Sequence, residues 1–127
     1  MVPAAILAVV LLVAVAAFQL GLALGAPWGA AAWGGQNPGV LPQPLRIASG
    51  VAGVVVYPLI IALVLACAGL IDDGWLPVDG TIIMWALAVI LGIGAVMNFA
   101  SRSHPERRWG AVALTIALCC VVIALGV

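Results

Sequence analysis

The stretch that decides the fold is PAAILAVVLLVAVAAFQLGLALG, residues 3–25, whose only polar side chain is Gln19. A helix needs about 20 consecutive apolar residues to cross the hydrocarbon core of a bilayer. The run therefore predicts a membrane-spanning helix. It lacks the basic flank of a secretory signal peptide, and its apolar part is too long for one, so we expect this helix to be retained.

Three further apolar runs follow, at about residues 45–70, 80–100 and 104–127. The chain of 127 residues is 67% hydrophobic and 6% charged, with a mean hydropathy of +1.37. A soluble domain carries about 25% charged residues, and no polar run here is long enough to fold alone in water. We therefore predict one all-α domain, a polytopic protein whose four transmembrane helices form an up-down bundle in a lipid bilayer.

Signals for helix ends support this division. Pro44 suits the first turn of the second helix, where a missing N–H group costs nothing, and Asp79 suits the N-cap of the third. Ser103 and Glu106 have the spacing of a capping box that opens the fourth helix. Pro58 lies inside the second helix and predicts a kink near Tyr57, because it removes one backbone hydrogen bond.

The basic residues predict the orientation. All four are arginines in the first and third connections, namely Arg46, Arg102, Arg107 and Arg108, whereas the second connection, DDGWLPVDG at residues 72–80, is acidic. Because basic residues mark the cytoplasmic side, we expect both termini to be extracytoplasmic. The excess of Ala, Val and Gly and the absence of Lys indicate a bacterial genome, so the expected location is the inner (plasma) membrane.

The first connection, residues 26–44, is unusual in composition. It begins with the stretch GAPWGAAAWGG at residues 25–35 and carries Trp28, Trp33 and no charged residue. Helix–helix connections in bundles usually have about 2 to 8 residues. We expect this long, uncharged connection to cover the cytoplasmic ends of the helices and to contact residues 98–107. Both indoles would then be buried or at the membrane interface, with Asn98 or Arg102 donating to loop carbonyls.

Polar side chains gather at this same end, where Gln19, Ser49 and the segment NFASRSHPERRW at residues 98–109 are expected to meet. The candidate ligand-binding residues are Trp28, Trp33, Asn37, Asn98, Ser101, Arg102, Glu106 and Arg107. Structural interpretations stay open beside this one. The two tryptophans are also typical interfacial anchors, Arg102 suits a helix C-terminus, and Arg107 and Arg108 suit anionic lipid headgroups.

Several kinds of site are not indicated. Cys67, Cys119 and Cys120 lie inside apolar runs without metal or redox spacing, so we interpret them as packing residues. His104 is the one histidine, and the three aspartates of the acidic connection do not match a calcium loop. We therefore expect no metal and no cofactor. The lack of a basic tail argues against a nucleic-acid partner.

Two blocks of sequence carry a resemblance. LGAPWGAAAWGGQNPGVLP at residues 24–42 with LRIAS at 45–49 forms one block, and NFASRSHPERRWG at 98–110 forms the other. Together they resemble a group of uncharacterised small bacterial integral membrane proteins that share the patterns GAPWG…WGG…LP…LR and N--SRS--ER--W. The resemblance implies a four-helix fold, and it brings no activity or substrate with it.

Three functions are compatible with these features. The first is non-enzymatic: binding of a lipid headgroup, a small anionic or aromatic ligand, or a partner subunit at the cytoplasmic face. The alternative is a small transporter or channel subunit that acts as a homo-oligomer, which a polar path through both leaflets would favour. The third is an enzyme that modifies a lipid, with His104 or Glu106 as acid or base, although no nucleophile motif accompanies them.

Overall fold

The computed structural model describes residues 1–126, which form helices joined by connections of different length. Helix α1 spans Val2–Ala23. A second long helix, Gln43–Cys67, consists of α2 (Gln43–Val51), a π-helical segment (Ala52–Val56) and α3 (Tyr57–Cys67), and it is followed by α4 (Gly80–Phe99) and α5 (His104–Leu125). Within residues 1–126, four helices are long and apolar enough to cross a membrane. The predicted all-α four-helix fold is confirmed; the predicted end at Val127 lies outside the described residues.

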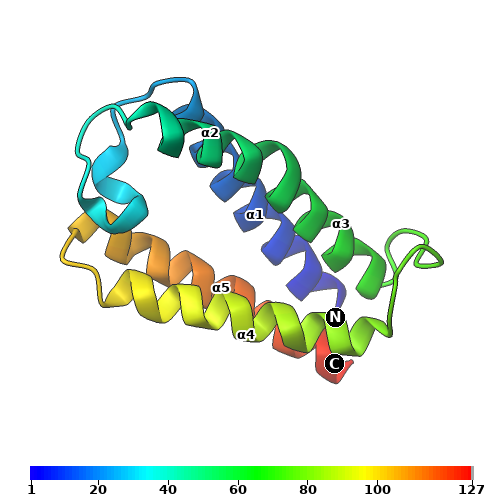
Figure 1. Cartoon of the computed structure of the whole chain (residues 1–127). Helices are drawn as coiled ribbons and strands as arrows, with labels where there is room; N and C mark the ends of the chain where they lie inside the picture. The colour runs from blue at the N-terminus through cyan, green and yellow to red at the C-terminus, as the bar shows by residue number, and fades with distance from the viewer. Residues whose placement is uncertain (127) are drawn as a thin grey trace.

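The helices form two hairpins (Figure 1). One consists of α1 and the helix α2–α3, the other of α4 and α5, and α1 also packs against α5. Both termini and the α3–α4 connection lie at one end of the molecule, where the hairpins are close together. The hairpins diverge toward the other end, and the connection between α1 and α2 lies between them there. We call these the terminal end and the loop end.

Helices α1 and α3 stop slightly earlier than predicted, and glycines explain both ends. Gly25 and Gly69 have φ of +97° and +77°, a left-handed conformation that glycine adopts without steric cost. The N–H of the residue after each glycine donates back across the helix end, from Ala26 to Gly21 O at 2.9 Å and from Leu70 to Leu65 O at 2.9 Å. This C-cap satisfies carbonyls that the helix itself leaves free.

The predicted distortion at Pro58 is confirmed. The segment Ala52–Val56, directly before the proline, is π-helical, and the Tyr57 N–H bonds to Ala52 O, five residues back. The wider turn accommodates the proline ring, which in a regular helix would clash with the carbonyl four residues earlier. The N-caps are confirmed as well: Asp79 accepts from Thr81 N at 2.8 Å, and Ser103 accepts from Glu106 N at 3.4 Å.

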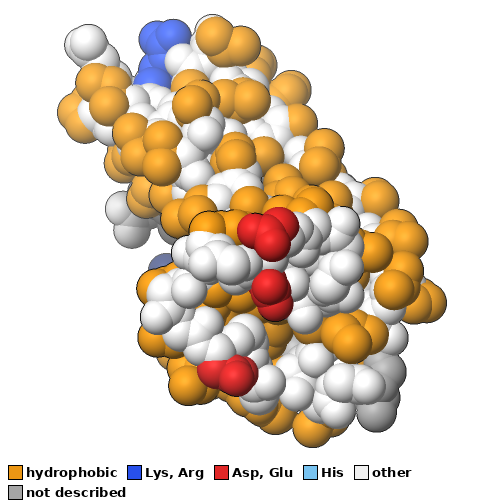
Figure 2. All heavy atoms as spheres, turned by 90° about the vertical axis from the view of Figure 1, so that its right-hand side faces the viewer, with side chains coloured by type: hydrophobic (Ala, Val, Ile, Leu, Met, Phe, Trp, Pro, Cys, Tyr) orange, Lys and Arg blue, Asp and Glu red, His pale blue; other side chains and the backbone are white. Residues whose placement is uncertain are grey.

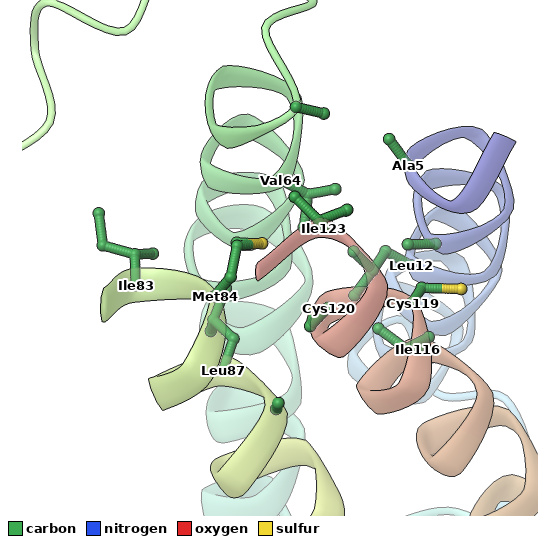
Figure 3. Close-up of a cluster of buried hydrophobic side chains, with 13 residues drawn as sticks. Ala5, Leu12, Val64, Ile83, Met84, Leu87, Ile116, Cys119, Cys120 and Ile123 are labelled. Carbon is green, nitrogen blue, oxygen red and sulfur yellow. The ribbon is translucent and has the colours of Figure 1, made fainter. Parts of the chain in front are cut away.

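The main apolar core fills the half of the bundle near the terminal end. Its fully buried side chains include Leu12 from α1, Val64 from α3, Met84 from α4, and Ile116 and Cys120 from α5. Figure 3 shows these side chains turned toward one another between the helices. The half near the loop end has a smaller apolar cluster, which consists of Leu22, Ala32 and Leu41.

The two ends differ in charge. Asp72, Asp73 and Asp79 are exposed at the terminal end, where Figure 2 shows acidic side chains grouped on a largely uncharged and apolar surface. The four arginines belong to the connections and helix starts of the loop end. The charge separation that underlies the predicted orientation is therefore present in the fold.

Candidate functional site

The α1–α2 connection, residues 24–42, folds into a compact unit with two short 3-10 turns, Gly29–Ala31 and Trp33–Gly35. The Gly29 N–H donates to Gly39 O at 2.8 Å, which closes the connection on itself. Gly29 is buried, and a Cβ atom there would lie 1.8 Å from Asn37 O. Any larger residue would therefore force these two backbone segments apart.

Three hydrogen bonds fasten this connection to the helices. The indole N–H of Trp33 donates to Ser49 Oγ at 3.0 Å, the N–H of Gly34 donates to Glu106 Oε2 at 2.9 Å, and Ser103 Oγ donates to the carbonyl of Ala30. Ser49 is fully buried and Glu106 is 6% exposed. The predicted contact between the first connection and residues 98–107 is therefore confirmed.

The predicted donors in this contact were wrong. Within residues 1–126, Asn98 and Arg102 donate no side-chain hydrogen bond to the connection. Arg102 is exposed in the turn before α5, whereas Ser103 and Glu106 belong to the first turn of α5, which packs against residues 29–31. The capping-box spacing had identified both residues, but Glu106 bonds Gly34 instead of the Ser103 N–H, which donates to Ser101 Oγ at 3.1 Å.

Two arginines have roles that the sequence did not indicate. Arg46 Nε donates to Ala23 O at 3.2 Å, at the C-terminus of α1. Arg107 Nη2 donates to Arg102 O at 3.2 Å, at the turn between α4 and α5. Arg46 thus satisfies a carbonyl at a helix C-terminus, where positive charge is favourable. Arg107 bonds a turn carbonyl before α5, and its buried Nε has no hydrogen-bond partner among residues 1–126.

The tryptophans of the connection lie at its rim. Trp28 is 47% and Trp33 is 45% exposed, so neither is fully buried. The ring of Trp28 stacks on Phe18 with a centroid distance of 5.8 Å, and Phe18 also contacts Trp109 at 4.7 Å. An aromatic column thus joins the connection, α1 and α5. Whether the exposed faces meet the membrane interface stays a prediction.

Trp33 has an unusual backbone. Its φ is +52°, and it is the one non-glycine residue with positive φ in the part of the chain described. A bulky residue in this region is strained, and such strain persists only where the surroundings enforce it. Here the enforcing contacts are the bonds of Trp33 to Ser49 and of the next residue, Gly34, to Glu106.

A cavity of about 310 Å³ lies between the helices beneath this connection. All four long helices contribute to its wall, and residues 31–33 of the connection border it. It is lined by Val15, Phe18, Gln19, Ala31, Ala32, Trp33, Ala52, Tyr57, Leu91, Asn98, Glu106, Trp109, Ala113 and Ile116. A second, more polar pocket of about 680 Å³ adjoins it, because Trp33, Asn98 and Glu106 line both.

The cavity is lined by an acidic side chain and by no basic one among residues 1–126. Glu106 is the ionisable carboxyl group in its lining, and no arginine lines it. Glu106 forms no ion pair within residues 1–126, and its bonding partner is the neutral N–H of Gly34. The amide oxygen Oε1 of Gln19 is also buried without a hydrogen-bond partner. Buried polar atoms are nearly always paired in native proteins, so an unpaired oxygen beside a cavity indicates a site for a ligand or water.

The fold brings together only part of the predicted set. Trp33, Asn98 and Glu106 line the cavity, and Ser101 and Arg102 line the adjoining pocket. Trp28, Asn37 and Arg107 line neither. The sequence did not indicate Phe18, Tyr57 or Trp109 as site residues. Phe18 and Tyr57 lie in apolar runs and look like ordinary packing, and Trp109, directly after two arginines, is typical of the membrane interface.

No group of metal-ligating side chains large enough to hold an ion forms within residues 1–126. Comparisons of the chain with known protein families, with curated proteins and with solved structures give no significant match.

Proposed function

We propose that this protein is a multi-pass protein of the bacterial plasma membrane that binds a small amphipathic molecule in the cavity at its loop end. The observation that carries the proposal is an apolar cavity that is lined by the buried Glu106, which has no ion pair within residues 1–126, and by Gln19, whose buried Oε1 has no hydrogen-bond partner. Its volume of about 310 Å³ is at the lower end of the range of ligand pockets, about 300–1,000 Å³.

The loop end faces the cytoplasm in this proposal, because all four arginines belong to it and basic residues mark the cytoplasmic side. The exposed Arg102 and Arg108 then meet anionic lipid headgroups. The ligand enters from the cytoplasm or the inner leaflet through the adjoining pocket, past Trp33. The resemblance of residues 24–49 and 98–110 to small bacterial membrane proteins supports the location, and these two blocks coincide with the connection and the turn that close the cavity.

Ligand binding fits better than conduction by an oligomeric transporter or channel. The apolar core of Leu12, Met84 and Ile116 occupies the bundle between the cavity and the terminal end. A smaller polar pocket at the terminal end is lined by Asp73, Asp79 and Thr81. The apolar core separates it from the cavity, whereas substrate and ion pathways are usually marked by polar or charged groups inside the membrane.

Orientation is tested with single cysteines in a variant lacking Cys67, Cys119 and Cys120. Position 36 in the α1–α2 connection and position 74 in the acidic connection are both exposed. A membrane-impermeant thiol reagent applied to intact cells is expected to label Gly74→Cys and not Gln36→Cys. Labelling of Gln36→Cys alone would contradict the proposed orientation.

Ligand binding is tested with a panel of benzyl compounds whose head groups have one shape and different charge: benzyltrimethylammonium, neopentylbenzene and benzylsulfonate. Isothermal titration uses the full chain in phosphatidylcholine nanodiscs, with empty nanodiscs subtracted. Ala113 lines the cavity and Ala111 on the same helix is exposed. Ala113→Leu should weaken binding of the bound probes at least about tenfold, or about 1.4 kcal/mol, and Ala111→Leu should not. Absence of binding by every probe, or indifference to Ala113→Leu, would overturn the proposal.

A further inference from the structure

The cavity at the loop end combines one buried acid with several aromatic rings. Glu106 is 6% exposed, and the rings that line the cavity with it belong to Phe18, Trp33, Tyr57 and Trp109. These four rings come from α1, the connection, α3 and α5, and those of Phe18 and Trp109 are in contact. The geometry points to an organic cation, a quaternary ammonium or a protonated amine with an apolar body, as the ligand. This inference rests on the proposed function and specifies its ligand.

The first argument is the carboxyl group of Glu106. An ionised carboxylate removed from water needs a compensating charge or several hydrogen bonds. Within the described residues it receives the Gly34 N–H and no ion pair. A cation in the cavity would supply the missing charge. The free Gln19 Oε1 adds a second negative dipole, which can also accept a hydrogen bond from a protonated amine.

The second argument is the aromatic lining. The face of an aromatic ring is negative, so it attracts a cation, most strongly where water is excluded. Tryptophan is the most effective ring for this purpose, and two of the four rings are those of Trp33 and Trp109. Cages of such rings are the usual means by which proteins bind quaternary ammonium groups.

The third argument concerns the arginines, which are not available to an anion in the cavity. Arg46 bonds the carbonyl of Ala23 at the end of α1, and Arg107 bonds the carbonyl of Arg102 in the turn before α5. Neither lines the cavity. Arg102 lines only the adjoining pocket. An anion inside the cavity would meet Glu106 without any counter-charge. This conflicts with the anionic ligand that the arginine-rich sequence suggested.

The benzyl panel tests the sign of the charge without any mutation, because its members differ in charge at nearly constant shape. Benzyltrimethylammonium is expected to bind at least about tenfold more tightly than neopentylbenzene, and benzylsulfonate more weakly than both. If the neutral or anionic compound binds best and Ala113→Leu blocks it, the cation inference fails while the proposed function stands. If no compound binds, both fail.

A charge-neutral variant then identifies the group responsible. Glu106→Gln keeps an oxygen that can accept from the Gly34 N–H and removes the negative charge. It should weaken benzyltrimethylammonium binding at least about tenfold and leave neopentylbenzene binding unchanged. Asp73→Asn, the same charge change on an exposed residue at the terminal end, is the matched control and should change neither. Unchanged cation affinity in Glu106→Gln would overturn the inference.

The aromatic contribution has its own test. Trp109→Leu should weaken binding of the cation several-fold more than binding of neopentylbenzene, because only the cation uses the negative face of the ring. Trp85 on α4 is 43% exposed and outside the cavity, so Trp85→Leu is the matched control. An equal loss for the cation and the neutral compound would show that Trp109 supplies only apolar contact and would contradict its role as a cation-binding ring.

Discussion

The terminal end and the loop end of this bundle are built by the same helices, yet their interiors differ. Near the terminal end, Leu12, Val64 and Met84 interlock in a core with almost no exposure. Near the loop end, the two hairpins diverge (Figure 1), and the space between them holds a cavity bordered by Glu106 and Gln19. The loop end is therefore the candidate functional region, because the helices pack less completely there and the buried Gln19 Oε1 has no hydrogen-bond partner.

The origin of the difference lies in the connections. The α3–α4 connection packs Leu76 against the core and leaves its aspartates exposed at the surface. The α1–α2 connection lies between the hairpins and bonds to α2 through Ser49 and to α5 through Ser103 and Glu106. It thus replaces helix–helix contact with loop–helix contact. A wall made by a connection can open, whereas the interlocked core cannot open without loss of packing.

The largest difference in stability between the two regions is expected from Leu→Ala substitutions, one in the core and one beside the cavity. Leu12 is fully buried in the core, and Leu91 is partly buried where the core meets the cavity. Leu12→Ala should lower the free energy of unfolding by about 3 kcal/mol, and Leu91→Ala by about 1 kcal/mol, because its side chain already lacks neighbours on one side. Unfolding by SDS titration measures both. Equal losses would mean that the loop end is as tightly packed as the core.

A matched pair of glycine substitutions tests the fold of the connection. A Cβ atom on Gly29 would meet Asn37 O at 1.8 Å, whereas one on Gly92 of α4 would meet no atom within 4 Å. Gly29→Ala should destabilise the protein by about 2 kcal/mol, and Gly92→Ala should not destabilise it. Thermal unfolding in detergent compares the two. A tolerant Gly29→Ala variant would show that the connection is not the compact unit described.

Ser103 is expected to matter more than the donors that the sequence suggested. Ser103→Ala removes the N-cap of α5 and leaves the carbonyl of Ala30 without its donor. The expected loss in unfolding free energy is about 1–2 kcal/mol. Asn98→Ala and Arg102→Ala should be close to neutral in the same SDS titration, since neither side chain bonds the connection. A larger loss for Asn98→Ala or Arg102→Ala than for Ser103→Ala would support the sequence-based hypothesis that Asn98 or Arg102 holds the connection.

The smallest effect is expected at the rim. Trp33→Phe keeps a ring over the cavity but removes the N–H that bonds the buried Ser49, which should cost about 1 kcal/mol. Trp28→Phe keeps a ring able to stack on Phe18 and should cost less. Thermal unfolding in detergent measures both variants. A larger loss at Trp28 would mean that the aromatic column, and not the Ser49 bond, holds the connection.

Much of this fold could be predicted because membrane helices follow from local composition. The apolar runs, the caps at Asp79 and Ser103 and the distortion before Pro58 each depend on a few neighbouring residues. The helix ends at Gly25 and Gly69 were placed a little too late, because a glycine among apolar residues does not by itself indicate a left-handed turn. The folding of the connection over the loop end followed from its length and its lack of charge.

The site was less predictable because it depends on which side chains meet across helices. Glu106 appeared to be a helix cap, but the packing of α5 turns it toward Gly34 and the cavity. The arginines suggested an anion, yet two of them bond backbone carbonyls, at the end of α1 and in the α4–α5 turn, and none lines the cavity. In the sequence Tyr57 resembles a packing residue and Trp109 an interfacial anchor. Only the placement of the four helices makes both of them part of the wall of one cavity.

The most direct test of an open loop end and a closed terminal end is the accessibility of α5 to a small, water-soluble thiol reagent. Ala113 lines the cavity, and Ala117, one turn further toward the terminal end, is 5% exposed. Each is replaced by cysteine in the variant lacking native cysteines, and labelling is followed in nanodiscs. Ala113→Cys should react at least about tenfold faster than Ala117→Cys. A bound benzyl probe should slow the reaction of Ala113→Cys. Equal rates, or faster labelling at position 117, would contradict the account.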